Sequence, residues 1–250
     1  MESLGSISEI LTTLSDDAQV ITRVGNNPYA FYGYKTKGVF ATTAEAEAAN
    51  LTNRSGLKYA AGDVHYVDVN NDGIINDDDK QVIGSATPDF YGSLFTRFEY
   101  RRFALDFTFT YSRGNDIYNA VRRVTESGSD FSNQSTSLAR RWSMEGQVTD
   151  IPRASWADEI GNNAFSDRWI EDGSYLKLSN VTFSYTWDKP LWSFIQGGTA
   201  FVTGQNLFTI SNYLGLDPET SYSYSSLTQG IDFGKVASPR SVKIGINLRF

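Results

Sequence analysis

Carboxylate and amide side chains alternate along one short segment, residues 68–79, and their oxygens could bind a metal ion. The segment begins Asp-Val-Asn-Asn-Asp-Gly, which matches the D-x-[DN]-x-[DN]-G pattern of calcium-binding loops, and Asp79 supplies a carboxylate at the last position of that pattern. Oxygen donors at alternating positions reach one ion only if the chain turns sharply, and Gly73 permits that turn. The spacing therefore predicts a structural Ca²⁺ site.

The predicted ligands are side-chain oxygens and one backbone carbonyl. They are Asp68, Asn70, Asp72, the carbonyl of Ile74, Asn76 and Asp79. Asp79 stands at the position where an EF-hand has Glu. Because the Asp side chain is shorter, bidentate ligation requires a tighter loop, as in dockerin-like calcium loops. Residues 81–88 show no amphipathic helical pattern, and a full EF-hand is therefore not expected. The alternative is a solvated turn rich in Asn, Asp and Gly that binds no ion.

His65 is the only histidine of the chain. Without a second imidazole or a thiol near it, we expect a strand or loop residue rather than a transition-metal ligand or a catalytic base. The sequence shows no Ser/His/Asp arrangement, no phosphate-binding glycine loop and no carboxylate pair at glycosidase spacing. We therefore expect that the protein is not an enzyme.

A polar stretch, residues 130–141, is followed by two tryptophans, Trp142 and Trp156. Polar and aromatic groups in this combination suit contact with a ligand. Helical packing over the mouth of a barrel would use the same residues, so the sequence leaves both interpretations open.

The elements that hold these residues are strands, and the clearest of them ends the chain. In residues 242–250 every second side chain is apolar, up to the terminal Phe250, while the intervening side chains are small or polar. A period of two predicts a strand with one apolar and one polar face. We expect Phe107 and Ile246 to face lipid, and Asp106 and Asn247 to face the lumen of a transmembrane barrel.

Other segments repeat this alternation. Strands are predicted over residues 94–100, 103–111, 176–187 and 199–210, with a shorter, Gly-interrupted strand over 30–40. Only Arg101 and Arg102 separate the first two strands, which predicts a tight hairpin. The alternation changes phase near Asn180, where we expect a β-bulge or a passage from protein surroundings into lipid.

The connections between the predicted strands alternate between long and short. Residues 41–89, 113–174 and 211–240 are long connections, whereas residues 101–102 and 188–198 are short. Outer-membrane barrels have this pattern because their outer loops are long and their periplasmic turns short. The fold class predicted is all-β, part of a transmembrane antiparallel barrel with long extracellular loops.

Composition agrees with this interpretation and excludes others. The chain has 22 Lys and Arg against 29 Asp and Glu, a net charge of -7, which argues against a general nucleic-acid binder. Cysteine is absent, so disulfides, zinc–thiolate sites and thiol catalysis are excluded. No apolar run approaches the roughly 18–20 residues of a spanning helix. No signal peptide follows Met1, so we expect an internal start within a longer exported protein.

Several sequence blocks together resemble the SusC/RagA-type TonB-linked (TonB-dependent) outer-membrane transporters of Bacteroidetes. The blocks are Phe31-Tyr32-Gly33-Tyr34-Lys35, Gly38-Val39-Phe40, Gly62-Asp63-Val64, Asp68-Val69-Asn70-Asn71-Asp72-Gly73, Ile83-Gly84, Pro88-Asp89-Phe90-Tyr91-Gly92, Arg140-Arg141-Trp142, Ile151-Pro152-Arg153, residues 171–181, Gly204-Gln205-Asn206-Leu207-Phe208, Gly215-Leu216-Asp217-Pro218-Glu219 and the terminal Phe250. They occur in the order of the family and span residues 28–250.

The resemblance implies the C-terminal part of such a transporter, with about six to eight of the roughly 22 strands of its barrel. Residues 1–27 would end a preceding region, and residues 28–250 would form the barrel segment, including a calcium-loop region at 62–90 and an extracellular loop at 113–174. Phe250 would act as the barrel-assembly signal.

The same resemblance implies a function in the cell outer membrane of a Gram-negative bacterium. The whole protein would import glycans or peptides, with energy from TonB through a missing N-terminal region and with a SusD-like surface lipoprotein as partner; nucleic acid is not an expected partner. The alternative is a secreted, calcium-stabilised β-rich module that binds carbohydrate and dissolves without detergent.

Overall fold

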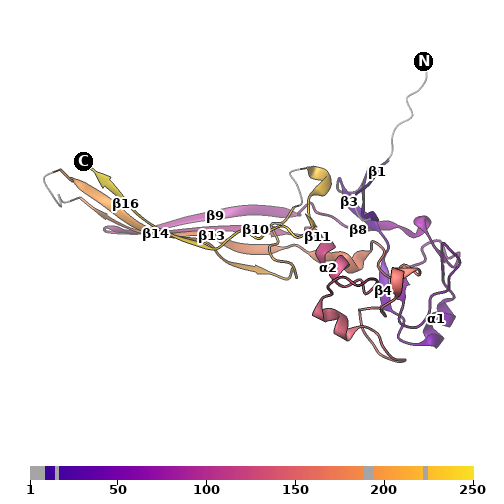
Figure 1. The fold of residues 1–250 in the computed structure, drawn as a ribbon. Helices are drawn as coiled ribbons and strands as arrows, with labels where there is room; N and C mark the ends of the chain where they lie inside the picture. Colours follow the sequence, from indigo (N-terminus) through magenta and orange to yellow (C-terminus); the bar gives the residue numbers. More distant parts are fainter. Residues whose placement is uncertain (1–8, 15–16, 189–193, 222–224) are drawn as a thin grey trace, which may run out of the picture. The chain divides into compact units, whose positions relative to one another are not determined.

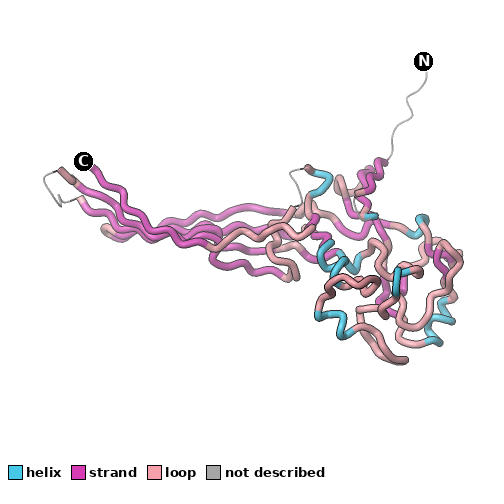
Figure 2. The backbone as a smooth tube through the Cα atoms, viewed as in Figure 1, coloured by secondary structure: helices cyan, strands magenta, loops and turns pink. Residues whose placement is uncertain are grey.

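The computed structural model describes residues 9–14, 17–188, 194–221 and 225–250. The chain forms two compact units, each assembled from three separate stretches. Unit 1 comprises Met1–Thr87, Asp116–Glu171 and Thr220–Lys235, and unit 2 comprises Pro88–Asn115, Asp172–Glu219 and Val236–Phe250. Strands make up most of unit 2, whereas loops and turns occupy much of unit 1 (Figure 2).

Unit 2 contains a sheet of five long antiparallel strands in the order β16-β14-β13-β10-β9 (Figure 1). The strands are β9 (Phe90–Tyr100), β10 (Phe103–Arg113), β13 (Tyr175–Trp187), β14 (Gly197–Ser211) and β16 (Ser241–Arg249). Their aromatic and β-branched residues favour the extended backbone. The four longest strands predicted from the alternation, and the terminal strand, are thereby confirmed.

The register separates apolar from polar side chains on the two faces of this sheet. Phe107 and Ile246 lie on the apolar face, whereas Asp106 and Asn247 lie on the polar face, as the period of two predicts. The apolar side chains are open, and Ile244 is 80% exposed. An apolar face of this extent requires a cover, and for the strands of a transmembrane barrel that cover is lipid.

Both local irregularities predicted for the sheet are present. Arg101 and Arg102 form the two-residue turn between β9 and β10, and Arg101 takes the left-handed backbone conformation (φ 56°) that such turns use. The pairing of β13 shifts register between Leu178 and Asn180 against both of its neighbours. The bulge adds one unpaired residue to β13, which shifts the alternation of its side chains by one position. The apolar side chains before and after the bulge therefore lie on the same face of the sheet.

Unit 1 is built from small sheets. A four-stranded sheet has the order β1-β2-β3-β8, and a three-stranded sheet has the order β12-β11-β15. The bounds of these strands are β1 (Glu9–Thr13), β2 (Gln19–Arg23), β3 (Ala30–Gly33), β8 (Gln81–Gly84), β11 (Asp116–Asn119), β12 (Ile170–Asp172) and β15 (Ile231–Asp232). Two strand pairs complete the unit, β4 (Thr36–Val39) with β6 (Val64–Tyr66) and β5 (Thr52–Asn53) with β7 (Ile74–Ile75).

The structure corrects the single strand predicted over residues 30–40. This segment forms two short strands, β3 and β4, which belong to different sheets. Gly33 ends β3 beside the backbone of Phe165, where a Cβ would lie 2.7 Å from the carbonyl oxygen. Phe31 and Phe40 then enter two separate hydrophobic clusters, so packing rather than periodicity divides the segment.

Among its described residues, unit 1 has two short α-helices, α1 (Thr43–Ala49) and α2 (Ala120–Thr125). The side chain of Thr42 accepts a hydrogen bond from the Glu45 N–H at the start of α1, and Asn50 ends the helix in the left-handed conformation. Within the described ranges, no helix is long and apolar enough to cross a membrane.

Candidate functional site

The acidic segment predicted from the sequence lies between β6 and β8 in unit 1. Its chain turns at Asn71 and Gly73, which have φ angles of 60° and 78°. It then enters β7, which pairs with β5, and a single 3₁₀ turn, Asp77–Asp79. The strand β8 follows instead of a helix, which agrees with the expectation that no full EF-hand is present.

Side-chain oxygens of the predicted ligands hold the turn together by accepting backbone hydrogen bonds. Asp68 accepts from the N–H groups of Asn71 at 2.7 Å and Gly73 at 2.8 Å. Asn70 accepts from Asp72 N–H at 3.1 Å, and Asp72 accepts from Ile74 N–H at 2.8 Å. These are short-range hydrogen bonds within the turn, from N–H groups two to five residues further along the chain.

Asp79 closes the segment and is fully buried. One carboxylate oxygen accepts from Val69 N–H at 2.8 Å, and the other accepts from Asn76 N–H at 2.9 Å. Its carboxylate thus joins the two ends of the loop. Asn76 in turn accepts from Asp78 N–H at 2.7 Å and donates its amide to the Ile74 carbonyl at 3.3 Å.

The donor set of this loop has the chemistry that Ca²⁺ requires, namely carboxylate, amide and carbonyl oxygens. Each oxygen retains a lone pair after accepting one hydrogen bond. In the described part of the chain, however, no group of three or more His, Asp or Glu residues is gathered closely enough to hold a metal ion. The ion site and the self-bonded turn are both compatible with this geometry, and the calcium site stays a prediction.

His65 lies in β6 beside this loop, as a strand residue. Its ring stacks on Phe40 with 4.2 Å between centroids. A hollow of about 630 Å³ opens next to the pair and is bordered by Glu45 of α1 and by Asp68. Burial, followed by the nearby charge of Lys37, lowers the pKa of His65 below its usual value. The imidazole is therefore a neutral, packed side chain at pH 7.

An ion pair that the sequence did not reveal links distant parts of unit 1. Asp63 is fully buried, and Arg153 donates to its two oxygens at 2.7 and 3.0 Å. Asn162 donates to the same carboxylate at 2.9 Å, while its own oxygen accepts from Val64 N–H at 2.8 Å. The motif blocks containing Asp63 and Arg153 were visible in the sequence, but their contact was not.

The two tryptophans of the long connection have different environments. The Trp142 indole donates to the Ala41 carbonyl at 3.1 Å, and its ring covers Gly62 so closely that a Cβ there would lie 2.4 Å away. Trp156 is 63% exposed and contacts Phe131, with 4.5 Å between ring centroids. Packing against Gly62 therefore accounts for the position of Trp142, whereas the exposed Trp156 side chain is available for contact with a ligand.

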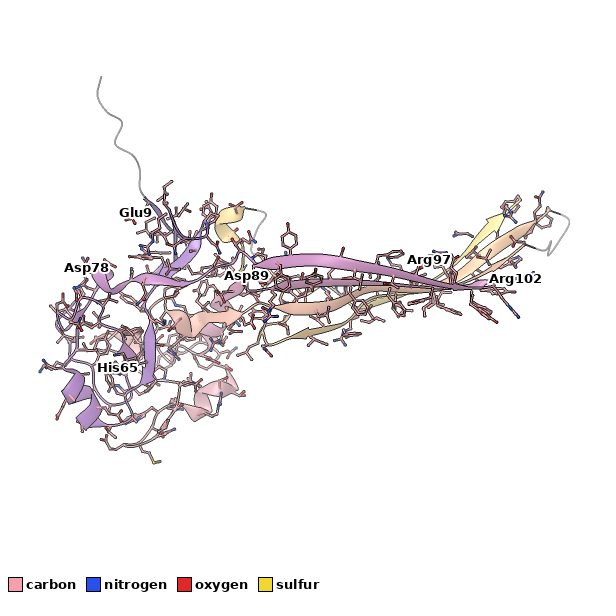
Figure 3. All side chains as sticks on the ribbon, turned by 180° about the vertical axis from the view of Figure 1, so that it is seen from behind. Glu9, His65, Asp78, Asp89, Arg97 and Arg102 are labelled. Atoms are coloured by element: carbon pink, nitrogen blue, oxygen red, sulfur yellow. The ribbon has the colours of Figure 1, made fainter. Side chains whose placement is uncertain are left out.

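Charged residues also line the polar face of the sheet in unit 2. Arg97 of β9 pairs with Glu99 at 2.6 Å and with Asp106 of β10 at 3.3 Å. Lys177 of β13 is buried and pairs with Glu219 from the connection after β14. Figure 3 shows Arg97 near the hairpin end of the sheet, which Arg102 marks. A charged inner face is typical of barrels with an aqueous lumen.

Proteins similar to this chain in sequence include several TonB-dependent receptors. No model of a protein family matches the sequence. Two TonB-dependent receptors of Formosa agariphila are 30% identical over 237 and 233 residues, which cover 92% and 91% of this chain and 23% of each receptor. The TonB-dependent receptor SusC of Bacteroides thetaiotaomicron is 28% identical over 193 residues, covering 74% of this chain and 17% of SusC.

Solved structures of the RagAB transporter have the same fold as this chain. The RagAB peptide importer in its open-open state matches with a TM-score of 0.75 and 20% identity, over 99% of this chain and 25% of that chain. A further structure of the RagAB peptide transporter matches with a TM-score of 0.71 over 97% of this chain.

These findings place the chain among the homologues of TonB-dependent receptors. Within that class its sequence is similar to SusC and its fold to the RagAB transporter, as the motif blocks indicated. Its antiparallel sheet is part of a transmembrane β-barrel that the chain does not close. The chain spans about a quarter of the length of the relatives it matches, 23% for each of the two Formosa receptors.

Proposed function

We propose that the whole protein is an active importer of the outer membrane, driven by TonB. The observation that carries this proposal is the five-stranded sheet, which has an exposed apolar face, a charged opposite face and the fold of the RagAB importer. Strands with these two faces form the wall of a barrel between lipid and water. The outer membrane is the compartment of such barrels, and the relatives come from Formosa and Bacteroides.

The proposed cargo is a glycan or a peptide, and the proposed partner is a SusD-like surface lipoprotein. The relative named SusC and the RagAB peptide importer support a cargo of this kind. Long connections between strands, such as the one that contains the exposed Trp156, provide a surface for cargo or partner. Coupling to TonB would use a region of the whole protein outside this segment, since the chain matches only 23% of each Formosa receptor.

The full-length gene in its native host tests this function. We expect deletion of the gene to abolish growth on one class of glycan or peptide, and deletion of TonB to have the same effect on that class. Fluorescently labelled oligosaccharides and peptides would identify the class by uptake. Unchanged growth and uptake on every glycan and peptide tested would refute import of these nutrients.

We also propose that the loop at residues 68–79 binds one Ca²⁺ through the predicted ligands. The donor chemistry and the position of Asp68, Asn70 and Asp72 in one tight turn support this proposal. Without the ion, the clustered carboxylates repel one another and the loop opens more readily.

Isothermal titration calorimetry with Ca²⁺ on the full-length transporter tests this site. Asp72→Ala removes a predicted ligand, whereas Asp78→Ala removes the same charge from the same loop without removing a ligand. We expect the first variant to lose one Ca²⁺ per protein and the second to retain it. Equal binding by the two variants would show that the loop is a turn and not an ion site.

A further inference from the structure

The polar face of the sheet in unit 2 carries a lysine that is almost fully buried. Lys177 of β13 lies in one row with Thr110 of β10 and Thr209 of β14, and only 3% of its side chain is exposed. Thr110 and Asp106 share one face of β10, and a residue directly opposite Thr110 points to the same side. Lys177 therefore points to the lumen, where a lysine is normally exposed to water, so another part of the chain must cover it.

The cover is the segment that follows β14, residues 212–219. The Lys177 ammonium pairs with the Glu219 carboxylate, and an oxygen of Asp217 lies 3.7 Å from the same ammonium. The Tyr175 hydroxyl, on the same face of β13, donates to Glu219 at 2.9 Å. One buried cation thus holds two carboxylates of a connecting segment against the wall of the barrel.

This contact places the segment within the end of the sheet. The strand β14 ends at Ser211, whereas Glu219 reaches Lys177 at the level of Thr209. Residues 212–219 therefore turn back over the polar face by roughly 7 Å, the length of two strand residues, instead of continuing away from the strand end.

The other end of the same connection is fastened to this segment. One oxygen of Asp217 accepts from Glu219 N–H at 3.1 Å, and the other accepts from Ser238 N–H at 3.0 Å. The Pro239 carbonyl accepts from the side chain of Asn206 in β14 at 3.2 Å. Burial opposes the ionisation of Asp217, but the hydrogen bonds from these two N–H groups and the charge of the nearby lysine leave its pKa below its usual value. The carboxylate is therefore ionised at pH 7.

The two ends of this connection, residues 212–219 and 236–240, together form an inward fold. It lies at the end of the sheet opposite the hairpin turn of Arg101, which is the end of the long extracellular connections. A buried charge is strongly unfavourable once its partners leave, so the ion pairs keep the fold in place. A segment held inside the mouth of a lumen occupies space through which cargo must pass.

We propose that Lys177 is a positioning residue that holds this fold inside the mouth of the lumen, where the fold limits the size of the cargo that enters. The size limit rests on the proposed import function, whereas the position of the fold depends on the sheet and its ion pairs alone. The two parts are therefore tested by separate measurements.

Hydrogen–deuterium exchange of the detergent-purified full-length transporter tests the position of the fold. Lys177→Met removes the ammonium and keeps the length of the side chain, and Glu219→Gln removes a partner charge without altering the strand. Lys243→Met is the matched control, because Lys243 lies on the same face in β16, is exposed and has no ion pair or side-chain hydrogen bond among the described residues. A heat-modifiable band on a gel confirms that each variant has assembled.

The amide of Ser238 reports on the fold, because it is bonded to Asp217. We expect it to exchange at least about 100-fold faster in Lys177→Met, the loss expected for a broken buried ion pair, and about tenfold faster in Glu219→Gln. Lys243→Met should leave it unchanged. Equal exchange of this amide in Lys177→Met, Glu219→Gln and the wild type would overturn the proposal.

Uptake by cells tests the size limit. Fluorescently labelled peptides and labelled oligosaccharides, each in a series of increasing length, are supplied to cells that carry the wild type or a variant. We expect uptake by Lys177→Met and Glu219→Gln to shift toward the longer probes, and uptake by Lys243→Met to match the wild type. A merely structural role of Lys177 would instead lower the uptake of all lengths together with the amount of folded barrel.

An unchanged length preference in a variant whose Ser238 amide exchanges faster would overturn the size limit. If the wild type takes up no probe of either class, the proposed import is refuted and the size limit with it. The exchange measurement is independent of import, so it still decides whether Lys177 holds the fold.

Discussion

The buried pair of Asp63 and Arg153 makes the sharpest structural prediction. Arg153→Ala removes two hydrogen bonds from a carboxylate that is fully buried, while the Asn162 amide and the Ala60 N–H continue to donate to it. Removing one partner of a buried ion pair costs about 3–5 kcal/mol. The Arg153 side chain is 42% exposed, so water reaches the carboxylate after truncation, and we set the cost at about 2–3 kcal/mol.

The loss of this ion pair should lower the local stability of the two segments that it connects, which lie 90 residues apart in the sequence. Hydrogen–deuterium exchange of the full-length protein measures it locally, because the amide of Val64 is bonded to Asn162 inside the same cluster. A cost of about 2–3 kcal/mol predicts exchange about 30- to 150-fold faster at this amide. A global melting temperature would be less informative, since the barrel dominates it.

Two further variants control the measurement. Arg141→Ala removes an exposed arginine whose side chain donates to the Leu138 carbonyl of its own turn, and it should leave the Val64 amide unchanged. Asp63→Asn combined with Arg153→Ala should restore part of the protection, because the uncompensated charge is gone. Exchange in Arg153→Ala no faster than in Arg141→Ala would refute the reasoning.

Three other predictions concern the sheet and His65. Phe107→Arg should lower the yield of assembled barrel in the outer membrane, because a cation on the lipid face costs about 2–4 kcal/mol near the midplane, whereas Thr108→Arg on the polar face should not; equal yields would contradict the assignment of the faces. Deletion of Phe250 should reduce the folded, heat-modifiable band of the full-length transporter, and an unchanged band would remove its proposed role in assembly. The pKa of His65 is lowered in the folded protein, so the unfolded chain takes up the proton first and stability should fall as the pH drops below 6.5. The protection factor of the Phe40 amide, which is bonded to the Asp63 carbonyl beside His65, should fall with pH in hydrogen–deuterium exchange of the wild type and should do so less in His65→Phe; the same dependence in both would assign it to another group.

Local sequence was sufficient to predict the sheet of unit 2. A strand alternates its side chains whatever it pairs with, so the apolar positions of residues 103–111 and 242–250 reveal both the strands and their faces. The two-residue hairpin at Arg101 and the bulge near Asn180 are equally local, since each changes the spacing or the phase of the pattern. The order of the motif blocks along the chain was likewise sufficient to indicate the family.

The acidic loop was also visible in the sequence, because its oxygens and its glycine lie within one short segment. The structure added how the loop closes. The buried Asp79 at its last position accepts from the N–H group of Val69 near its start and from that of Asn76. Each of these carboxylate oxygens has two lone pairs and uses one to accept a hydrogen bond. The second lone pair is the one that an ion in the loop would use.

Only the tertiary structure revealed the long-range contacts and the strand boundaries of unit 1. Asp63 and Arg153, or Trp142 and Gly62, meet only after long connections have closed, and no local pattern records that closure. The division of residues 30–40 into two strands has the same origin, because Phe31 and Phe40 are buried in different clusters. Periodicity reports which side of an element is apolar, whereas the partner that covers it is chosen by packing across the whole chain.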